Sequence, residues 1–228
     1  MQRLRSWPHG QSIEAHVTDR PGAPRTRRDE YAEQTRRAVV DAARSLFAER
    51  GYVVTTVNEI AAASRVSPGT VYQQCGGKQG LLRTLMDIWT TSELVEGTLV
   101  LVENTSSLDE LLDVLSESYL EFWRRYDDIV QLVLATAAHD EGAAESLGAA
   151  TERHRSALHT IANVVRRHVD LPDSFTDDDF ADLTLYHYGP QSGFHFTVTV
   201  LGWSHERAQR FLRAQLASSL RRVAAGGE

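Results

Sequence analysis

Apolar residues recur at spacings of three and four over long segments of this chain, and that period most constrains its fold. In the first such segment they place one face of a helix on Thr35, Ala38, Val39, Ala42, Leu46 and Phe47. Gly and Pro are sparse inside these segments, and no clear run of alternating residues indicates strands. The 228 residues, 42% of them hydrophobic, can bury one large core or two modest ones. The sequence therefore predicts an all-α protein with about nine helices.

Helix ends are well marked in the first third of the chain. A first helix begins at Asp29 and ends before Gly51, because glycine is favoured just past a helix C-terminus. Thr56 and Glu59 fit a capping box, in which the threonine hydroxyl accepts a backbone N–H and the glutamate reaches back. A short second helix therefore covers about 56–63.

The stretch SPGTVYQQCGGK, residues 67–78, contains a third helix. Ser67 is a good N-cap and Pro68 suits the first helical position, so this helix runs over about 68–75. A fourth helix follows over about 78–96. Two short helices joined by a tight turn make a helix-turn-helix, whose second helix enters the DNA major groove with its N-terminal end forward.

Side chains on this third helix have the chemistry of DNA contacts. Gln73 and Gln74 can bind adenine edges through two hydrogen bonds, and Thr70 can meet a thymine methyl group. Gly69 allows close backbone approach, and Lys78 is placed to lie beside a phosphate. Other positions at this end leave two interpretations open, DNA contact or ordinary surface and core roles: Arg65, Ser67 and Tyr72.

Residues 33–89 resemble the TetR family of bacterial repressors. The resemblance rests on LFAERGY, a Thr-Thr pair opening the second helix, EIAAASRVSPGTVY, and a Gly-Lys followed by two leucines, all in order. It implies a homodimer that binds a palindromic operator through a three-helix N-terminal domain, and a C-terminal domain that binds a small ligand releasing the DNA. Carried over by position, the family's usual DNA contacts fall on Thr56, Pro68, Gly69, Thr70, Tyr72, Gln73, Gln74 and Lys78.

Two positions depart from the family pattern. Cys75 stands where an aromatic residue usually ends the recognition helix, and Gly77 replaces the common serine before the lysine. The first change removes a large packing group, and the second removes an N-cap for the next helix. Cys75, the chain's one cysteine, is interpreted as a small buried residue, with a redox-sensing thiol as the alternative.

Charge is distributed unevenly, which predicts a division of labour along the chain. Residues 25–80 carry nine Lys and Arg against six Asp and Glu, whereas residues 81–228 carry twelve against twenty-three. We expect a disordered basic tail over 1–28, a DNA-binding domain over 29–80 and an effector-binding and dimerisation domain over 81–228. The tail is interpreted as a solvated leader or as a basic arm on DNA phosphates.

Several classes of function lack support in the sequence. The longest apolar run, residues 129–138, is too short to span a bilayer, and no signal-peptide core follows the N-terminus, so we expect a cytoplasmic protein without a membrane partner. No nucleophile, base and orienting acid can be assembled, so no catalytic residue is predicted. The run Asp177–Asp179 is expected to open a helix and not to bind metal, and no metal site or cofactor is predicted.

The C-terminal part reads as five helices, over 108–125, 127–138, 141–169, 176–200 and 204–224. The string FADLTLYHYGPQSGFHFTVTVL, 180–201, is apolar or aromatic nearly all round, which indicates a helix buried on more than one side. This helix and the last one, helices 8 and 9 of the prediction, are expected to form a four-helix interface in a homodimer.

Pro190 is expected to kink the helix over 176–200, because proline removes a backbone hydrogen bond. Aromatic walls with few polar groups suit a small, partly apolar effector. The predicted ligand-binding residues are Trp89, Tyr119, Phe122, Trp123, Tyr126, His187, Gln191 and Phe194. Plain core and dimer packing remains the alternative for each of them.

The sequence as a whole predicts a ligand-responsive transcriptional regulator, most simply a repressor, that binds double-stranded DNA. The alternative is a helical ligand-binding or protein-interaction module that has lost DNA binding, because the body is acidic and Cys75 departs from the family pattern. An enzyme is the third class, and it has no positive support.

Overall fold

The computed structural model of the protein describes residues 26–90 and 93–226, and the side chains of residues 89, 90 and 93 lie outside this description. Within the described residues there are ten α-helices and no strand, which confirms the all-α prediction. The helices are α1 (Arg27–Arg50), α2 (Val57–Ala63), α3 (Pro68–Cys75), α4 (Gly77–Thr90), α5 (Glu93–Glu103), α6 (Leu108–Ala137), α7 (Glu141–His168), α8 (Asp177–Tyr188), α9 (Gly193–Thr199) and α10 (His205–Ala224).

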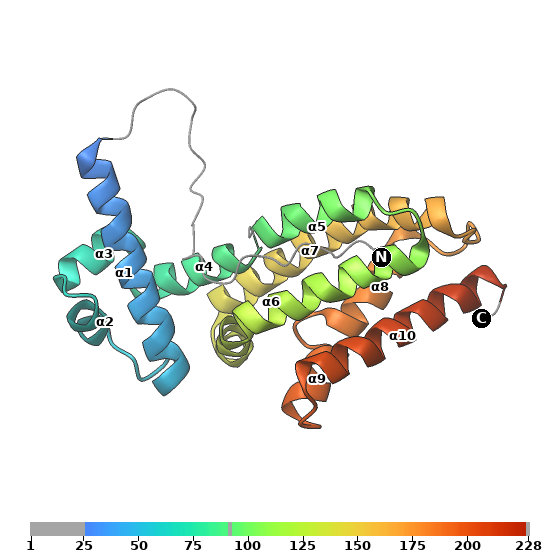
Figure 1. The fold of residues 1–228 in the computed structure, drawn as a ribbon. Coiled ribbons are helices and arrows are strands. Elements are labelled where there is room, and N and C mark those ends of the chain that lie inside the picture. Colours follow the sequence, from blue (N-terminus) through green and yellow to red (C-terminus); the bar gives the residue numbers. More distant parts are fainter. Residues whose placement is uncertain (1–25, 91–92, 227–228) are drawn as a thin grey trace.

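The first three helices form a group at one end of the molecule (Figure 1). Thr26 caps α1, so this helix begins two residues before the predicted Asp29. The capping box predicted for α2 is present, with the Thr56 backbone N–H donating to Glu59 at 2.8 Å. Apolar side chains from all three helices meet in a small core, which includes Val39, Phe47, Ile60 and Val71.

Helix α4 joins this group to the rest of the protein (Figure 1). It packs against α1 and α3 on one side and against α6 and α7 on the other. Leu81, Leu82, Leu85 and Met86 are its buried apolar residues. A movement of α4 therefore has to be transmitted to the helix-turn-helix.

The remaining helices form a bundle around the long α6 and α7. Helix α6 contacts α7 and α10, and α8 packs against α7. Trp123 of α6 is 1% exposed and stacks on Phe194 of α9, with ring centroids 5.4 Å apart. Helix α10 lies along the lower edge of this bundle in Figure 1 and buries Ala208, Leu212 and Leu216.

A bidentate ion pair also links the two groups of helices. The Arg44 guanidinium of α1 donates from Nε to one Asp128 carboxylate oxygen at 2.6 Å and from Nη2 to the other at 2.7 Å. Asp128 belongs to α6, and Arg44 Nη2 also reaches the backbone carbonyl of Arg125. The planar fork of arginine matches a carboxylate, so this pair fixes an orientation as well as a distance.

Three predicted helix boundaries were wrong. Residues 108–125 and 127–138 belong to one helix, α6, because no Gly or Pro interrupts its apolar stripe. The helix predicted over 78–96 ends at Thr90, and α5 continues to Glu103 with Leu94, Thr98 and Val102 on its buried side.

The third correction concerns residues 176–200, which form two helices and not one kinked helix. Gly189 ends α8, and Ser192 caps α9 by accepting a hydrogen bond from the Phe194 backbone N–H at 3.2 Å. Pro190 lies between them and has no N–H with which to continue the helical hydrogen bonds.

None of the helices that the structure describes is long and apolar enough to cross a membrane. The predicted basic tail lies outside the described residues up to position 25, while Arg27 and Arg28 belong to α1.

Candidate functional site

Helix α3 is built so that its first turn faces outward. The Ser67 hydroxyl accepts a hydrogen bond from the Thr70 backbone N–H at 3.1 Å, and Pro68 takes the first helical position, as predicted. Val71 and Cys75 are buried against the neighbouring helices. Gly76 ends the helix in the left-handed conformation at φ 72°. The buried face of α3 is therefore apolar, and the opposite face is polar and accessible.

The predicted DNA-contacting residues lie on α3, in the turn before it and at the starts of α2 and α4. Those with exposed side chains or backbone are Thr56, Arg65, Ser67, Pro68, Gly69, Tyr72 and Gln73. Thr70, Gln74 and Lys78 are half-buried beside them. Tyr72 is 60% exposed, which leaves its ring available to a partner molecule.

Lys78 is held by the loop between α1 and α2. Its ammonium group donates to the backbone carbonyl of Val53 at 3.1 Å and lies 4.5 Å from the centre of the Tyr52 ring. Partial burial lowers the pKa of Lys78 from its usual value. An ammonium group has three donors, so this hydrogen bond leaves others for a phosphate.

The two departures from the family pattern have structural explanations. Cys75 is 7% exposed, and its burial raises the pKa of the thiol, which confirms the interpretation as a small buried residue. Gly77 begins α4 at φ 73°, a left-handed conformation that glycine adopts without strain. A Cβ on Gly77 would also lie 2.7 Å from Cε1 of Tyr72. Both observations favour glycine at the junction between the recognition helix and α4.

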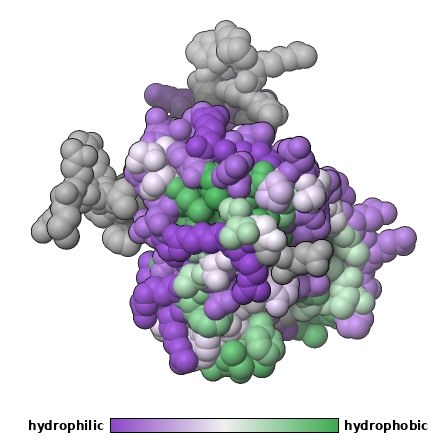
Figure 2. All heavy atoms as spheres, turned by 90° about the vertical axis from the view of Figure 1, so that its right-hand side faces the viewer, coloured by the Kyte–Doolittle hydropathy of each residue, from purple (hydrophilic) through white to green (hydrophobic). Residues whose placement is uncertain are grey.

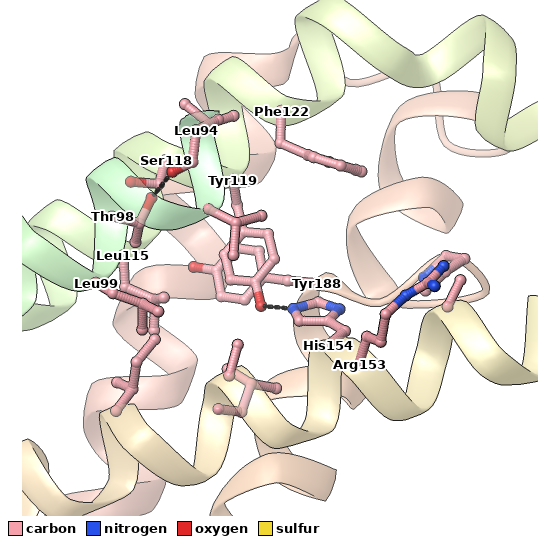
Figure 3. Close-up of a pocket in the computed structure, with 16 residues that line it drawn as sticks. Leu94, Thr98, Leu99, Leu115, Ser118, Tyr119, Phe122, Arg153, His154 and Tyr188 are labelled. Carbon is pink, nitrogen blue, oxygen red and sulfur yellow. Dashed lines mark hydrogen bonds between the residues drawn. The ribbon is translucent and has the colours of Figure 1, made fainter. Parts of the chain in front are cut away.

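A cavity of about 100 Å³ lies in the bundle between α5, α6, α7 and α8 (Figure 3). Most of its lining is apolar and includes Leu94, Leu99, Leu115, Phe122, Leu158 and Ile161. An apolar cavity of roughly 150 Å³ is known to take up benzene, so this space suits a ring or a short chain.

Two aromatic rings and an imidazole form the polar part of the cavity. The Tyr119 hydroxyl and His154 Nε2 are hydrogen-bonded at 2.6 Å, and the Tyr119 and Tyr188 rings stack with centroids 4.4 Å apart (Figure 3). His154 is half-buried in the bundle and lines the cavity. Burial lowers the pKa of His154 to about 4, so the imidazole is neutral at pH 7. Burial also raises the pKa of both tyrosines.

Only part of the predicted ligand-binding set meets this cavity. Tyr119 and Phe122 line it, and Gln191 lines a second hollow beside the α8–α9 break. Trp123, Tyr126, His187 and Phe194 are buried in the packing between helices and do not belong to the lining. The side chain of Trp89 lies outside the description.

Sequence reasoning missed the part of the cavity that α7 provides. His154 and Arg153 line it, and neither was selected. A signal existed, because Ala150, His154, Leu158 and Ile161 follow one another at spacings of four, four and three on the apolar face of α7. A histidine within an apolar stripe is the feature of the sequence that could have indicated this position.

Apolar side chains are also exposed on the far part of the molecule. Figure 2 shows them gathered at its lower end, where Figure 1 places α9 and the loop that follows it. The exposed large apolar residues from α8 to α10 are Tyr186, Phe196, Val200, Leu201 and Phe211.

Asp177, Asp178 and Asp179 open α8, as predicted. In residues 26–90 and 93–226 no group of three potential metal ligands is assembled.

Comparison with known proteins identifies the N-terminal group of helices. The family model "Bacterial regulatory proteins, tetR family" matches residues 39–85. The chain is 37% identical over 71 residues to the HTH-type transcriptional repressor Rv3405c of Mycobacterium tuberculosis, covering 31% of this chain and 38% of the relative. It is 34% identical over 84 residues to HbdR of Aromatoleum sp., covering 36% and 33%. The matches therefore span less than two fifths of these relatives, around the helix-turn-helix.

Solved structures match most of the chain at low sequence identity, so these matches show similarity of fold alone. SmeT in complex with triclosan has a TM-score of 0.67 at 16% identity, covering 82% of this chain and 91% of SmeT. NalD, the secondary repressor of the MexAB-OprM efflux pump in Pseudomonas aeruginosa, has a TM-score of 0.62 at 19% identity, covering 83% and 97%. The helix-turn-helix segment over 39–85 therefore matches the TetR family of bacterial regulatory proteins, and the ten-helix fold over the described residues is similar to that of these solved structures.

Proposed function

We propose that this protein is a ligand-responsive transcriptional regulator, most simply a repressor, that binds a palindromic operator as a homodimer in the cytoplasm. The observation that carries the proposal is the orientation of α3. Its leading end, with Ser67, Pro68 and Gly69, is exposed, and Tyr72 and Gln73 are exposed one turn further on. A helix presented in this way can enter a major groove. The proposal includes no catalytic step.

The residues around α3 divide into two kinds of DNA contact. Gln73, Gln74 and Thr70 are the base-reading candidates, because amide and hydroxyl groups pair with base edges. Lys78, Arg65 and the N-terminus of α3 are the phosphate-binding candidates. The proposed DNA-binding domain covers 29–80, and the effector-binding and dimerisation domain covers 81–228.

The homodimer is proposed to form through α8, α9 and α10, the segments of the predicted helices 8 and 9. Phe196, Val200 and Phe211 are 51%, 64% and 45% exposed, and a soluble chain gains by burying such a patch. On α10 the residues one and two turns from Phe211 are Gln215 and Ser218, which are also exposed. Their small or slender side chains allow a partner helix to approach closely. Two chains related by a two-fold axis would present two α3 helices to two half-sites.

The cavity between α5 and α8 is proposed as the effector site. Its α6 wall, at Tyr119 and Phe122, lies on the same helix as Asp128, which holds Arg44 of α1. Its α7 wall packs against α4. A ligand that changes the spacing of these helices therefore acts on both connections to the helix-turn-helix. Linkage requires that the ligand and the DNA weaken each other by one shared factor.

The function is tested by a mobility-shift assay on the DNA upstream of the protein's own gene, with sedimentation of the same sample. The proposal expects a sequence-selective complex that contains two chains. A dimer that binds no DNA selectively, while it still takes up a small molecule, would instead favour a helical ligand-binding or interaction module.

A further inference from the structure

The interior of the cavity offers a ligand few polar groups. The buried Tyr188 hydroxyl has no hydrogen-bond partner among the described residues, and the other three hydroxyl groups of the lining are already bonded. Thr98 Oγ1 donates to the Leu94 carbonyl at 2.6 Å, and Ser118 Oγ donates to the Val114 carbonyl at 2.9 Å. The Tyr119 hydroxyl is paired with His154. A charged group placed among these residues would lose its hydration without a matching partner, which is costly. The part of a ligand that lies inside is therefore uncharged and largely apolar, and the Tyr188 hydroxyl can bond one polar atom of it.

One charged side chain stands at the edge of this space. Among the described residues that line the cavity, Arg153 alone carries a permanent charge. Arg153 directly precedes His154 on α7. Figure 3 shows the Arg153 guanidinium on the far side of the His154 imidazole from Tyr119. The side chain is 48% exposed, so a charged group bound there stays in contact with water. The lining thus combines an apolar interior with a single cation at its rim.

Arg153 lies near an acid on the helix that follows the recognition helix. Arg153 Nη2 lies 3.9 Å from Asp87 Oδ1, a separation too long for a hydrogen bond. Asp87 is on α4, which begins at Gly77 directly after α3. A new anion on Arg153 would compete with Asp87 and would add a like charge beside it.

We propose that the effector is a small amphipathic carboxylic acid, whose apolar body fills the cavity and whose carboxylate binds Arg153 in competition with Asp87. This inference rests on the proposed function only where it calls the ligand an effector; the binding site stands independently. A carboxylate matches the planar guanidinium through two parallel hydrogen bonds. A single cation beside an acid favours a monoanion over a dianion such as a phosphate ester, which Asp87 would repel more strongly.

The test uses pairs of acids and their primary amides, which share shape and differ in charge. Hexanoate, octanoate, phenylacetate and 3-phenylpropionate are titrated by calorimetry into the full chain, each beside its amide. At least one acid is expected to bind about tenfold or more tightly than its amide, because a hydrogen bond to a charged group is worth more than a neutral one. Equal affinities within every pair, or no binding by any acid at millimolar concentration, overturns the proposal.

Three variants locate the carboxylate. Arg153→Gln is expected to lower the affinity of the acid to that of the amide and to leave the amide unchanged. Asp87→Asn is expected to tighten the acid alone, since its competitor for Arg153 has lost its charge. Arg167→Gln is the control, because Arg167 is an exposed arginine of the same helix that pairs with Glu103 and does not line the cavity. An acid preference that survives in Arg153→Gln contradicts the site.

The regulatory part is measured separately, by adding the bound acid to a complex of the protein with DNA. Release of DNA by the acid and not by its amide supports the full inference. If the acid binds at Arg153 and the DNA complex is unchanged, the ligand site holds and the effector role fails. If the protein forms no selective DNA complex, the proposed function fails and the acid–amide comparison still decides the ligand class.

Discussion

The ring of Tyr72 lies against Gly77, so closely that a Cβ on Gly77 would be 2.7 Å from Cε1 of the tyrosine. Tyr72 is on the recognition helix and Gly77 begins α4. The contact therefore sets the position of an exposed DNA-contact candidate by the start of the helix that connects to the effector domain.

Gly77→Ala is expected to destabilise the protein by about 1–3 kcal/mol. Its φ of 73° costs an L-residue roughly 1–2 kcal/mol, and the remainder is the cost of moving the Tyr72 ring. The matched control is Gly148→Ala in α7, where an added Cβ meets no atom within 4 Å. That change should stabilise the protein by about 0.5–1 kcal/mol, because alanine is the better helix former. Urea unfolding measures both, and a neutral Gly77→Ala would refute the account of this junction.

The Arg44–Asp128 pair is expected to contribute a measurable coupling between the two groups of helices. The side chains are 21% and 36% exposed, so the attraction is only partly screened by water. A double-mutant cycle with Arg44→Met and Asp128→Leu should give a coupling of about 1 kcal/mol. The same cycle on the exposed pair Arg167–Glu103 should give less. Because Arg167 also contacts both carboxylate oxygens of Glu103, equal couplings for the two pairs would show that partial burial adds nothing.

His154 makes stability depend on pH in a defined window. Burial lowers the pKa of His154 from 6.5 to about 4. Between these two pH values the histidine is protonated in the unfolded chain and neutral in the folded protein. The free energy of unfolding is therefore unaffected by His154 above pH 6.5. It falls as the pH is lowered from 6.5 to about 4, by a total of about 3 kcal/mol. His154→Gln should flatten this part of the curve, while the exposed His139→Gln should not. Parallel curves for wild type and His154→Gln would contradict the burial of a neutral imidazole.

Gln73 and Lys78 are expected to behave differently on DNA. Gln73→Ala should cost about 1–3 kcal/mol on a selected operator and little on random DNA, because glutamine reads a base edge. Lys78→Met keeps an unbranched side chain and removes the charge that lies over Tyr52, so it should weaken binding to all sequences alike. For this variant, the slope of the logarithm of the DNA-binding constant against the logarithm of the salt concentration should fall in magnitude by about one unit. Equal losses for Gln73→Ala on both DNAs would assign that residue to the phosphate contacts.

The sequence predicts best where local chemistry decides the structure. Thr56 with Glu59, and Ser67 with Pro68, specify helix starts through bonds within four residues, and both starts were predicted at the observed positions. The all-α class followed from the apolar period for the same reason. The break at Pro190 was also visible, although its result, two separate helices, depends on whether a new cap such as Ser192 is available.

The cavity could be predicted only in part, because it depends on which faces of distant helices meet. Trp123 and Phe194 are aromatic like Tyr119 and Phe122, yet they stack on each other away from the cavity. Arg153 and His154 carry no local signal of a pocket except the apolar stripe around them. Gly77 shows the same limit, since the preference for glycine comes from the Tyr72 ring and from a left-handed φ that the sequence alone does not reveal.

The most direct measurement of the central claim is selection of binding sites from a random DNA library, followed by counting the chains on the selected duplex. The account predicts an inverted repeat whose half-sites are one helical turn, about 34–36 Å, or a multiple apart, with each repeat bound by one α3 of a dimer. Enrichment should weaken with Gln73→Ala, most of all at the base that Gln73 reads. A library without enrichment, or a single unrepeated site bound by one chain, would contradict it.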